Sequence, residues 1–116
     1  EDKRFFSLDA SKKVREALHM MKANDISQIP VMKGDHISGS ISESRILAFI
    51  LENPVSNLEK NIEAVMDDPL PQVPLDMGIQ DVSRYFDRKI PAVMTQDIAG
   101  NWHVITQYDI IRSIRG

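Results

Sequence analysis

The chain has 116 residues, of which 42% are hydrophobic and 27% are charged, values typical of one compact globular domain. Its formal net charge of −3 argues against a nucleic-acid partner, and the absence of cysteine excludes disulfides and thiolate metal ligands. We expect no signal peptide and no membrane span, because no apolar run approaches about eighteen residues. A cytoplasmic location is the expectation that follows. Because the sequence begins at Glu1 rather than Met, we also expect it to be part of a longer chain.

The first half of the chain predicts a hairpin framed by two helices. The expected elements are a lead-in strand at 5–8, a helix at 12–23, strands at 26–32 and 37–41, and a helix at 43–52. Asp9 or Ser11 is expected to cap the first helix, whose apolar residues recur at helical spacing. Pro30 is tolerable in an edge strand or at a first strand position, because it has no N–H donor. Gly34 suits the turn of the hairpin.

The second half predicts a similar order of elements after a connector rich in Asn, Asp and Pro. The expected elements are a connector at 54–72 with a helical turn at 61–66, a strand at 73–75, a helix from 76 or 78 to 86, a strand at 92–95, and a strand at 103–105 that runs into a helix containing 110–114. Both halves therefore have the order β-α-β-β-α.

Several landmarks occur twice with nearly the same separation. Pro30 and Pro91 are 91 − 30 = 61 positions apart, and Ser42 and Thr106 are 106 − 42 = 64 positions apart. Such a period indicates two related supersecondary units, each of which is marginal alone and shares a core with the other. We predict an α/β (α+β) fold built from two such repeats. The predicted divisions are a first repeat at 1–53, a connector at 54–72 and a second repeat at 73–116.

The strand-to-helix junction of the second half carries the pattern Thr106-x-x-Asp109. In one interpretation it is a capping box: the hydroxyl accepts from the N–H three residues on, and the carboxylate accepts from the Thr106 N–H. In the other, free N–H groups and the positive end of the helix dipole bind a phosphate or carboxylate, and Asp109 accepts from a sugar diol. The same atoms serve both interpretations.

The junction of the first half has Ser42 and, in the place of Asp109, Arg45. Arginine has five N–H donors and no acceptor, so it cannot accept a hydrogen bond from a diol. We therefore expect this second site to be degenerate, without nucleoside or with an anion in its place. The alternative is an exposed Arg45 without a ligand. One complete site per chain is the prediction.

Catalysis and metal binding find no support in the sequence. The three histidines lack the i, i+4 spacing of a helical metal site, and no G-x-S-x-G motif is present. The carboxylates that could act in pairs are Glu43, Asp67, Asp68 and Asp109. We expect no catalytic residue and no metal site, and we assign His103 no role.

The apolar surface of the helix at 43–52 is wider than a single stripe. Its apolar residues are Ile46, Leu47, Phe49, Ile50 and Leu51, and those of the last helix are Ile110, Ile111 and Ile114. Together they exceed what one small core readily covers. A homodimer that buries these helices is the expected consequence.

The two units resemble a pair of CBS domains, also called a Bateman module. The resemblance rests on the Ile-Pro-[Val/Ala] strands, the [Ser/Thr]-x-x-[Asp] junctions and the Val-Met…Pro…Val pattern at 64–73, and it extends from about Phe6 to Ile114. The sequence is most similar to the C-terminal regulatory region of cystathionine β-synthase, with which it shares a long connector and a variant first junction. The fold that this resemblance implies has two repeats packed with pseudo-twofold symmetry.

The resemblance implies recognition of an adenosine ligand, either S-adenosylmethionine or AMP, ADP or ATP. In this family the Thr of an intact junction meets the phosphate or its equivalent and the Asp takes the ribose hydroxyls, which assigns these roles to Thr106 and Asp109. The further positions carried over are Val104 and Tyr108, which flank the junction, and Ile26, Ser27, Gln28 and Ile29, which supply the adenine wall from the opposite repeat. Gln28 also has an alternative as a solvated strand residue. The acidic net charge and the lack of Lys or Arg close to Thr106 favour a less anionic ligand.

The resemblance also implies a regulatory role. The ligand would control an attached or associated protein, such as an upstream pyridoxal-phosphate-dependent cystathionine β-synthase domain in cis. An ion transporter or another enzyme is the alternative partner. The rival hypothesis is a purely structural dimerisation module, in which Thr106 and Asp109 only cap a helix.

Overall fold

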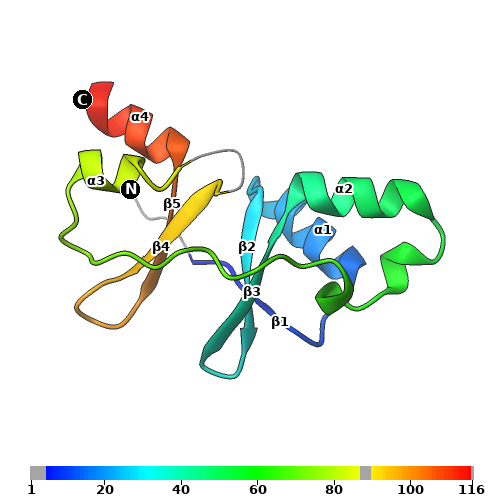
Figure 1. Cartoon of the computed structure of the whole chain (residues 1–116). Coiled ribbons are helices and arrows are strands. Elements are labelled where there is room, and N and C mark those ends of the chain that lie inside the picture. The colour runs from blue at the N-terminus through cyan, green and yellow to red at the C-terminus, as the bar shows by residue number, and fades with distance from the viewer. Residues whose placement is uncertain (1–4, 87–89, 116) are drawn as a thin grey trace. The chain divides into compact units, whose positions relative to one another are not determined.

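The computed structural model describes residues 5–86 and 90–115, the last three of these by their backbone alone (Figure 1). Contacts within the chain divide it into two compact units. One unit contains Phe6–Pro69; the other is formed by the chain from Leu70 onward, to which Phe5 also belongs, and is called here the unit that begins at Leu70. Each unit is a mixed arrangement of strands and helices, which confirms the predicted α/β (α+β) class.

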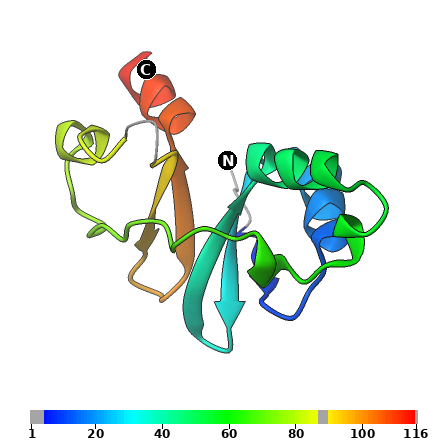
Figure 2. The same cartoon turned by 45° about the vertical axis from the view of Figure 1, so that its right-hand side comes forward.

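The unit Phe6–Pro69 is a three-stranded sheet with two helices on one face (Figures 1 and 2). Its elements are β1 (Leu8–Asp9), α1 (Val14–Asn24), β2 (Gln28–Lys33), β3 (His36–Ser42), α2 (Glu43–Glu52), and the short 3-10 helices η1 (Asn57–Glu59) and η2 (Ile62–Ala64). Strand β2 is central: it pairs in parallel with β1 and antiparallel with β3. The predicted hairpin is confirmed, and Gly34 in its turn has a positive φ of 59°.

The apolar stripe of α1 faces the core of this unit, as its spacing predicts. Val14, Ala17 and Met21 are buried there. The helix begins at Val14 rather than at Lys12, because Lys13 is the N-cap and its N–H donates to Glu16 Oε2 at 2.9 Å. The expected caps were therefore wrong. The Asp9 carboxylate instead accepts from the backbone N–H and the hydroxyl of Ser11.

Pro30 lies in the central strand and is buried, so the expectation of an edge or first position was wrong. Its partner in β3 is Ser40, whose backbone N–H and C=O both bond to Asp67, at 3.0 and 2.8 Å. Pro30 therefore occupies a pair that has no hydrogen bonds to β3, where a missing N–H costs nothing. On its other side, β1 pairs with β2 only from Val31 onward.

The stretch after α2 is fastened to the same unit by buried and backbone contacts. The buried Asn57 side chain donates to the Phe49 carbonyl at 2.7 Å, and the Val14 N–H donates to the Lys60 carbonyl at 2.9 Å. The two hydrogen bonds between Ser40 and Asp67 extend the edge of the sheet. Residues up to Pro69 thus belong to this unit. The division into two repeats and a connector at 54–72 stays a prediction.

The unit that begins at Leu70 has one two-stranded sheet. Its elements are α3 (Ile79–Ser83), β4 (Ala92–Gln96), β5 (Trp102–Thr106) and α4 (Gln107–Arg115). Strands β4 and β5 pair antiparallel, and α3 and α4 contact each other. The buried core of this unit is Val73, Val82 and Val93, with Met77, Tyr85, Phe86, Ile90, Ile105 and Ile110 packed against it.

Two expectations for this unit were wrong. The strand at 73–75 is reduced to a single bridge between Gln72 and Met94, since Pro74 has no N–H and its carbonyl accepts from Met77 in a turn. The helix expected to reach residue 86 ends at Ser83. Beyond Ser83 the N–H groups of Tyr85 and Phe86 bond three residues back, which closes tight turns in place of α-helix.

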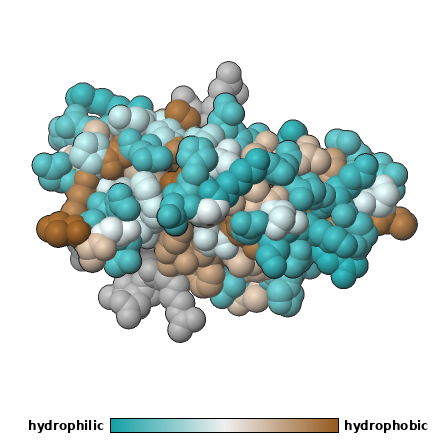
Figure 3. Space-filling view, turned by 90° about the horizontal axis from the view of Figure 1, so that it is seen from below, coloured by the Kyte–Doolittle hydropathy of each residue, from teal (hydrophilic) through white to brown (hydrophobic). Residues whose placement is uncertain are grey.

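The apolar surface of α2 is partly covered by its own unit. Ile46 is buried, and Phe49 and Ile50 pack against the unit's core, while Leu47 and Leu51 remain 46% and 78% exposed. On α4, Ile110 packs against its own core and Ile111 is half exposed, and the side chain of Ile114 lies outside the described part. The surface seen in Figure 3 is mostly hydrophilic, with separate hydrophobic patches.

Gly39 permits the close approach of residues 66 and 67 to β3, and its substitution tests this packing. An added Cβ would lie 2.6 Å from Met66 Sδ and 2.8 Å from the Asp67 carbonyl oxygen. We expect Gly39→Ala to lower the free energy of unfolding by about 1–3 kcal/mol, measured by chemical denaturation. Gly78→Ala is the control, since a Cβ there meets no atom within 4 Å; as the N-cap of α3 it is expected to cost less than about 1 kcal/mol. A cost for Gly39→Ala no larger than that of Gly78→Ala would contradict the argument.

Candidate functional site

The Thr106 junction forms a capping box at the start of α4. The Thr106 N–H and hydroxyl donate to Asp109 Oδ2 at 2.8 and 3.1 Å, and the Asp109 N–H donates to Thr106 Oγ1 at 3.4 Å. These are the reciprocal contacts that the sequence pattern predicts, so the capping interpretation is confirmed as geometry. Without these contacts, the first N–H groups of α4 would have no hydrogen-bond partner within the helix.

The capping box uses much of the hydrogen-bonding capacity of Thr106 and Asp109. The single proton of the Thr106 hydroxyl is given to Asp109, so toward a ligand this hydroxyl acts as an acceptor until it rotates. The Asp109 side chain is 22% exposed, which makes its carboxylate reachable from solvent. A carboxylate has about four acceptor positions, of which Thr106 uses two and Arg112 one, so a diol can bond to it twice only when the Thr106 hydroxyl rotates away. Capping by the Thr106 N–H and diol recognition are compatible on that condition.

Arg112 is a functional candidate that the sequence interpretation missed. Its Nη2 donates to Asp109 Oδ1 at 3.0 Å, so a cation does lie beside the junction. The lack of Lys or Arg close to Thr106, one of the two arguments for a less anionic ligand, is corrected by this contact, while the acidic net charge stays as the other. The i, i+3 spacing of Asp109 and Arg112 was the signal that could have found it.

The residues that flank the junction differ in exposure. Val104 is half-buried in β5, while Tyr108 in the first turn of α4 is 76% exposed. His103, which was assigned no role, pairs through Nε2 with Asp97 Oδ2 at 2.8 Å. That hydrogen bond, followed by one from the backbone N–H of Asn101, lowers the pKa of the Asp97 carboxyl from 3.8. The pair organises the β4–β5 loop and does not involve Thr106 or Asp109.

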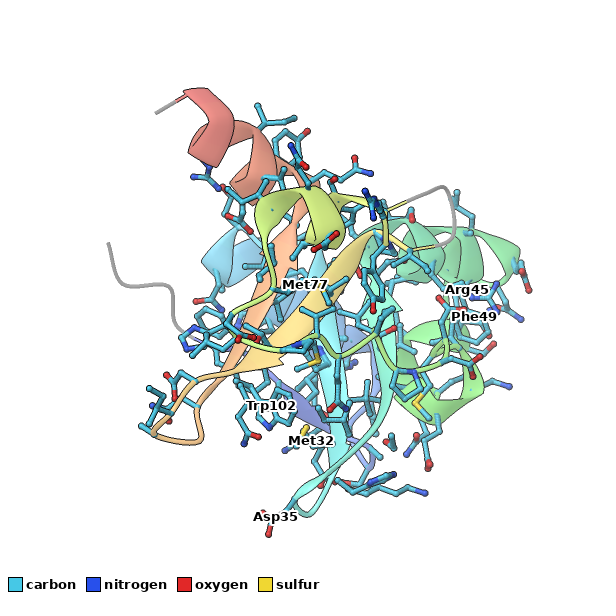
Figure 4. The ribbon with its side chains drawn as sticks, turned by 60° about the vertical axis from the view of Figure 1, so that its left-hand side comes forward. Met32, Asp35, Arg45, Phe49, Met77 and Trp102 are labelled. Atoms are coloured by element: carbon cyan, nitrogen blue, oxygen red, sulfur yellow. The ribbon has the colours of Figure 1, made fainter. Side chains whose placement is uncertain are left out.

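The Ser42 junction is also a helix cap, but its fourth residue serves another purpose. Ser42 Oγ accepts from the Arg45 N–H at 3.1 Å. The Arg45 Nε donates to the Val65 carbonyl at 3.2 Å and lies 4.0 Å from Asp67 Oδ1. Arg45 and Phe49 project from α2 one turn apart (Figure 4). At this junction the arginine thus holds the chain beyond α2 and supplies no acceptor for a diol.

The predicted adenine-wall residues lie at the start of β2, in the unit Phe6–Pro69. Ile26 and Gln28 are half-buried, Ser27 is exposed, and Ile29 is fully buried in the core of its own unit. The Ser27 carbonyl accepts from the N–H of Glu43, the first residue of α2, at 3.0 Å, and Gln28 pairs with Ser42. This end of β2 therefore lies beside the Ser42 junction. Ile29 has no exposed surface and pairs with Ile41 in the sheet, so in this structure it presents neither side chain nor backbone to a ligand.

The described part of the chain contains no candidate metal site. Residues 5–86 and 90–115 contain no group of three His, Cys, Asp or Glu side chains that could hold a metal ion. Glu43, Asp67 and Asp68 are exposed. No helix within residues 5–86 and 90–115 has the length and the apolar composition that a membrane span requires.

Comparison with known proteins finds a family match in the first half of the chain. Residues 2–52 match the family model of the CBS domain, and the match ends at the last residue of α2. None of the curated proteins matches the chain in sequence.

Solved structures of CBS-domain proteins share the fold of the whole chain. A protein with CBS domains from Burkholderia ambifaria has a TM-score of 0.81 at 17% identity, over 96% of this chain and 82% of that one. A CBS-domain protein from Agrobacterium tumefaciens has a TM-score of 0.85 at 11% identity, over 98% and 87%. CBSX2, whose structure was solved in complex with AMP, has a TM-score of 0.75 at 18% identity, over 97% and 88%. At these identities the similarity establishes the fold, which is that of CBS-domain proteins.

The Asp97–His103 pair predicts a measurable titration. Because the folded-state pKa of Asp97 lies below 3.8, the stability that this carboxylate contributes is present above that value and is lost as the pH falls through the lower folded-state pKa. An NMR titration of the Asp97 carboxyl carbon is expected to give a midpoint below 3.8, and His103→Ala is expected to move it back up. His36→Ala, in the other hairpin, is the control and leaves the midpoint unchanged. The same midpoint in the parent and in His103→Ala would contradict the assignment.

Proposed function

We propose that the chain is a regulatory module that binds an adenosine ligand through Thr106 and Asp109 and thereby controls an attached or associated protein. The observation that carries this proposal is the Thr106–Asp109 junction at the start of α4, in a fold shared with CBSX2, a protein solved with AMP. The CBS-domain match at 2–52 supports the same proposal. The ligand is AMP, ADP, ATP or S-adenosylmethionine.

The roles proposed for the junction follow from its atoms. The positive end of α4 favours an anionic or electron-rich group beside Thr106. The ionised Asp109 carboxylate accepts from the two ribose hydroxyls, which form stronger hydrogen bonds to a charged acceptor than to a neutral one. Val104 and Tyr108 flank these contacts. Ile26, Ser27, Gln28 and Ile29 stay the predicted adenine wall.

The Ser42 junction is proposed to bind no nucleoside. Arg45 has no acceptor for a ribose, and its Nε is used by the Val65 carbonyl. One adenosine ligand per chain is therefore the proposed stoichiometry. No catalytic role is proposed for any residue.

The regulated protein is proposed only by class. A pyridoxal-phosphate-dependent cystathionine β-synthase domain upstream in cis is one candidate, and an ion transporter or another enzyme is the alternative. A cytoplasmic location stays part of the proposal. The module is also proposed to form a homodimer, because Leu47 and Leu51 leave apolar surface on α2.

The second candidate function is a structural dimerisation module without a ligand. The observation that favours it is the closed capping box, in which Asp109 already accepts from Thr106 and Arg112. In this case the T-x-x-D pattern needs no ligand to explain it. Ligand binding separates the two candidates.

Asp109→Asn tests the ligand-binding proposal. Isothermal calorimetry is expected to detect binding of at least one of AMP, ADP, ATP and S-adenosylmethionine to the parent protein, with one site per chain. The amide keeps an acceptor for the Thr106 N–H but loses the charge, so we expect affinity to fall about tenfold to a hundredfold. Asp76→Asn, an exposed aspartate of the same unit, is the control. No heat with any of the four compounds would refute the proposal, and unchanged affinity in Asp109→Asn would leave Asp109 as a cap alone.

Leu51→Glu tests the proposed homodimer. A charge in the centre of a buried apolar contact is unfavourable, so we expect the dissociation constant to rise at least tenfold in sedimentation equilibrium. Ile98→Glu is the matched control, because Ile98 is 98% exposed in the β4–β5 loop and outside the proposed surface. A parent protein that is monomeric across the concentration range would refute the dimer.

A further inference from the structure

We infer that Arg112 is a positioning residue for the ribose-binding carboxylate, and this inference rests on the proposed function. Arg112 acts by holding Asp109 and does not contact the phosphate of the ligand. The contact that carries the inference is the 3.0 Å hydrogen bond from Arg112 Nη2 to Asp109 Oδ1.

The two oxygens of Asp109 are held from opposite directions along the chain. Thr106, three residues before it, donates twice to Oδ2, and Arg112, three residues after it, donates to Oδ1. A carboxylate held at only one oxygen can still turn about its last side-chain bond, whose torsion is broad. A second contact at the other oxygen restricts that rotation. The plane of the carboxylate is thereby set before a ligand arrives.

Fixing this plane matters because a cis-diol places two donors side by side. Both hydroxyls can bond to one carboxylate only if its plane is correctly oriented, so a fixed orientation removes an entropy cost from binding. Arginine suits this role because its planar guanidinium presents donors in a rigid fork and keeps its charge at all relevant pH values. A lysine in the same place would supply charge without that fixed geometry.

The other junction of the chain provides an internal comparison. Counting from the hydroxyl residue, the positions of Asp109 and Arg112 correspond to Arg45 and Ala48 at the Ser42 junction. The carboxylate and the arginine that holds it are thus both present at one junction and both missing at the other. A second i, i+3 pair, Arg84 with Asp81 at 3.3 Å, lies in the same unit but away from a T-x-x-D pattern. That pair supplies a matched control for the experiment.

Calorimetry with adenosine and with AMP tests the inference. We expect Arg112→Ala to weaken the binding of both compounds by the same factor, about threefold to tenfold, because a positioning residue affects the ribose contact that they share. Arg112→Lys is expected to recover part of the loss, and Arg84→Ala to leave both affinities unchanged. In the double variant Asp109→Asn with Arg112→Ala, the loss is expected to equal that of Asp109→Asn alone, since Arg112 acts through Asp109.

Three outcomes would overturn the inference. They are an Arg112→Ala variant that binds like the parent, a loss confined to AMP, and losses that multiply in the double variant; the last two would place Arg112 against the ligand itself. A fourth readout needs no ligand. The Nη signals of Arg112 in nitrogen-detected NMR are expected to be separate in the parent, as in a persistent ion pair, and to merge in Asp109→Ala. Merged signals in the parent would overturn the inference while leaving the proposed function intact, whereas a parent that binds no adenosine compound would overturn both.

Discussion

The first turn of a helix leaves backbone N–H groups without intrahelical partners, and the chain meets this constraint in the same way at two strand-to-helix junctions. Ser42 accepts from the N–H three residues on at α2, and Thr106 does so at α4. The helix cap uses a hydroxyl residue at the first position of the junction but requires no particular side chain three positions later. That position is therefore the one that differs in chemistry, with Arg45 at one junction and Asp109 at the other.

The residue at that position gives each junction a different structural role. Arg45 points its donor to the Val65 carbonyl and so helps to hold the chain beyond α2, where Ser40 already pairs with Asp67 through two backbone bonds. Asp109 instead turns back to its own cap and forward to Arg112. One junction has become part of the packing of its unit. The other retains an ionised acceptor that is reachable from solvent.

Local patterns in the sequence predicted what depends on local interactions. The bounds of α2 came out at Glu43–Glu52, and the capping box of Thr106 was found, because caps and apolar spacing are read within a few residues. Pro30 was misplaced because its tolerance in a central strand depends on Asp67, far away in sequence. Arg112 was missed for a related reason: the i, i+3 spacing permits the pair, but rotamers decide whether it forms.

A capping residue that also binds a ligand couples binding to the end of a helix. A ligand that binds only the folded state stabilises it by about 2.7 kcal/mol at a hundred times its dissociation constant. That stabilisation applies to the folded state as a whole, but if Asp109 accepts from the ribose the ligand's contacts lie at the first turn of α4 and none lies at Arg45. Binding would then affect the two strand-to-helix junctions unequally. A regulated partner can respond to this only to the extent that its two states differ in affinity for the strengthened junction, so the asymmetry between Asp109 and Arg45 is what would make a ligand a signal.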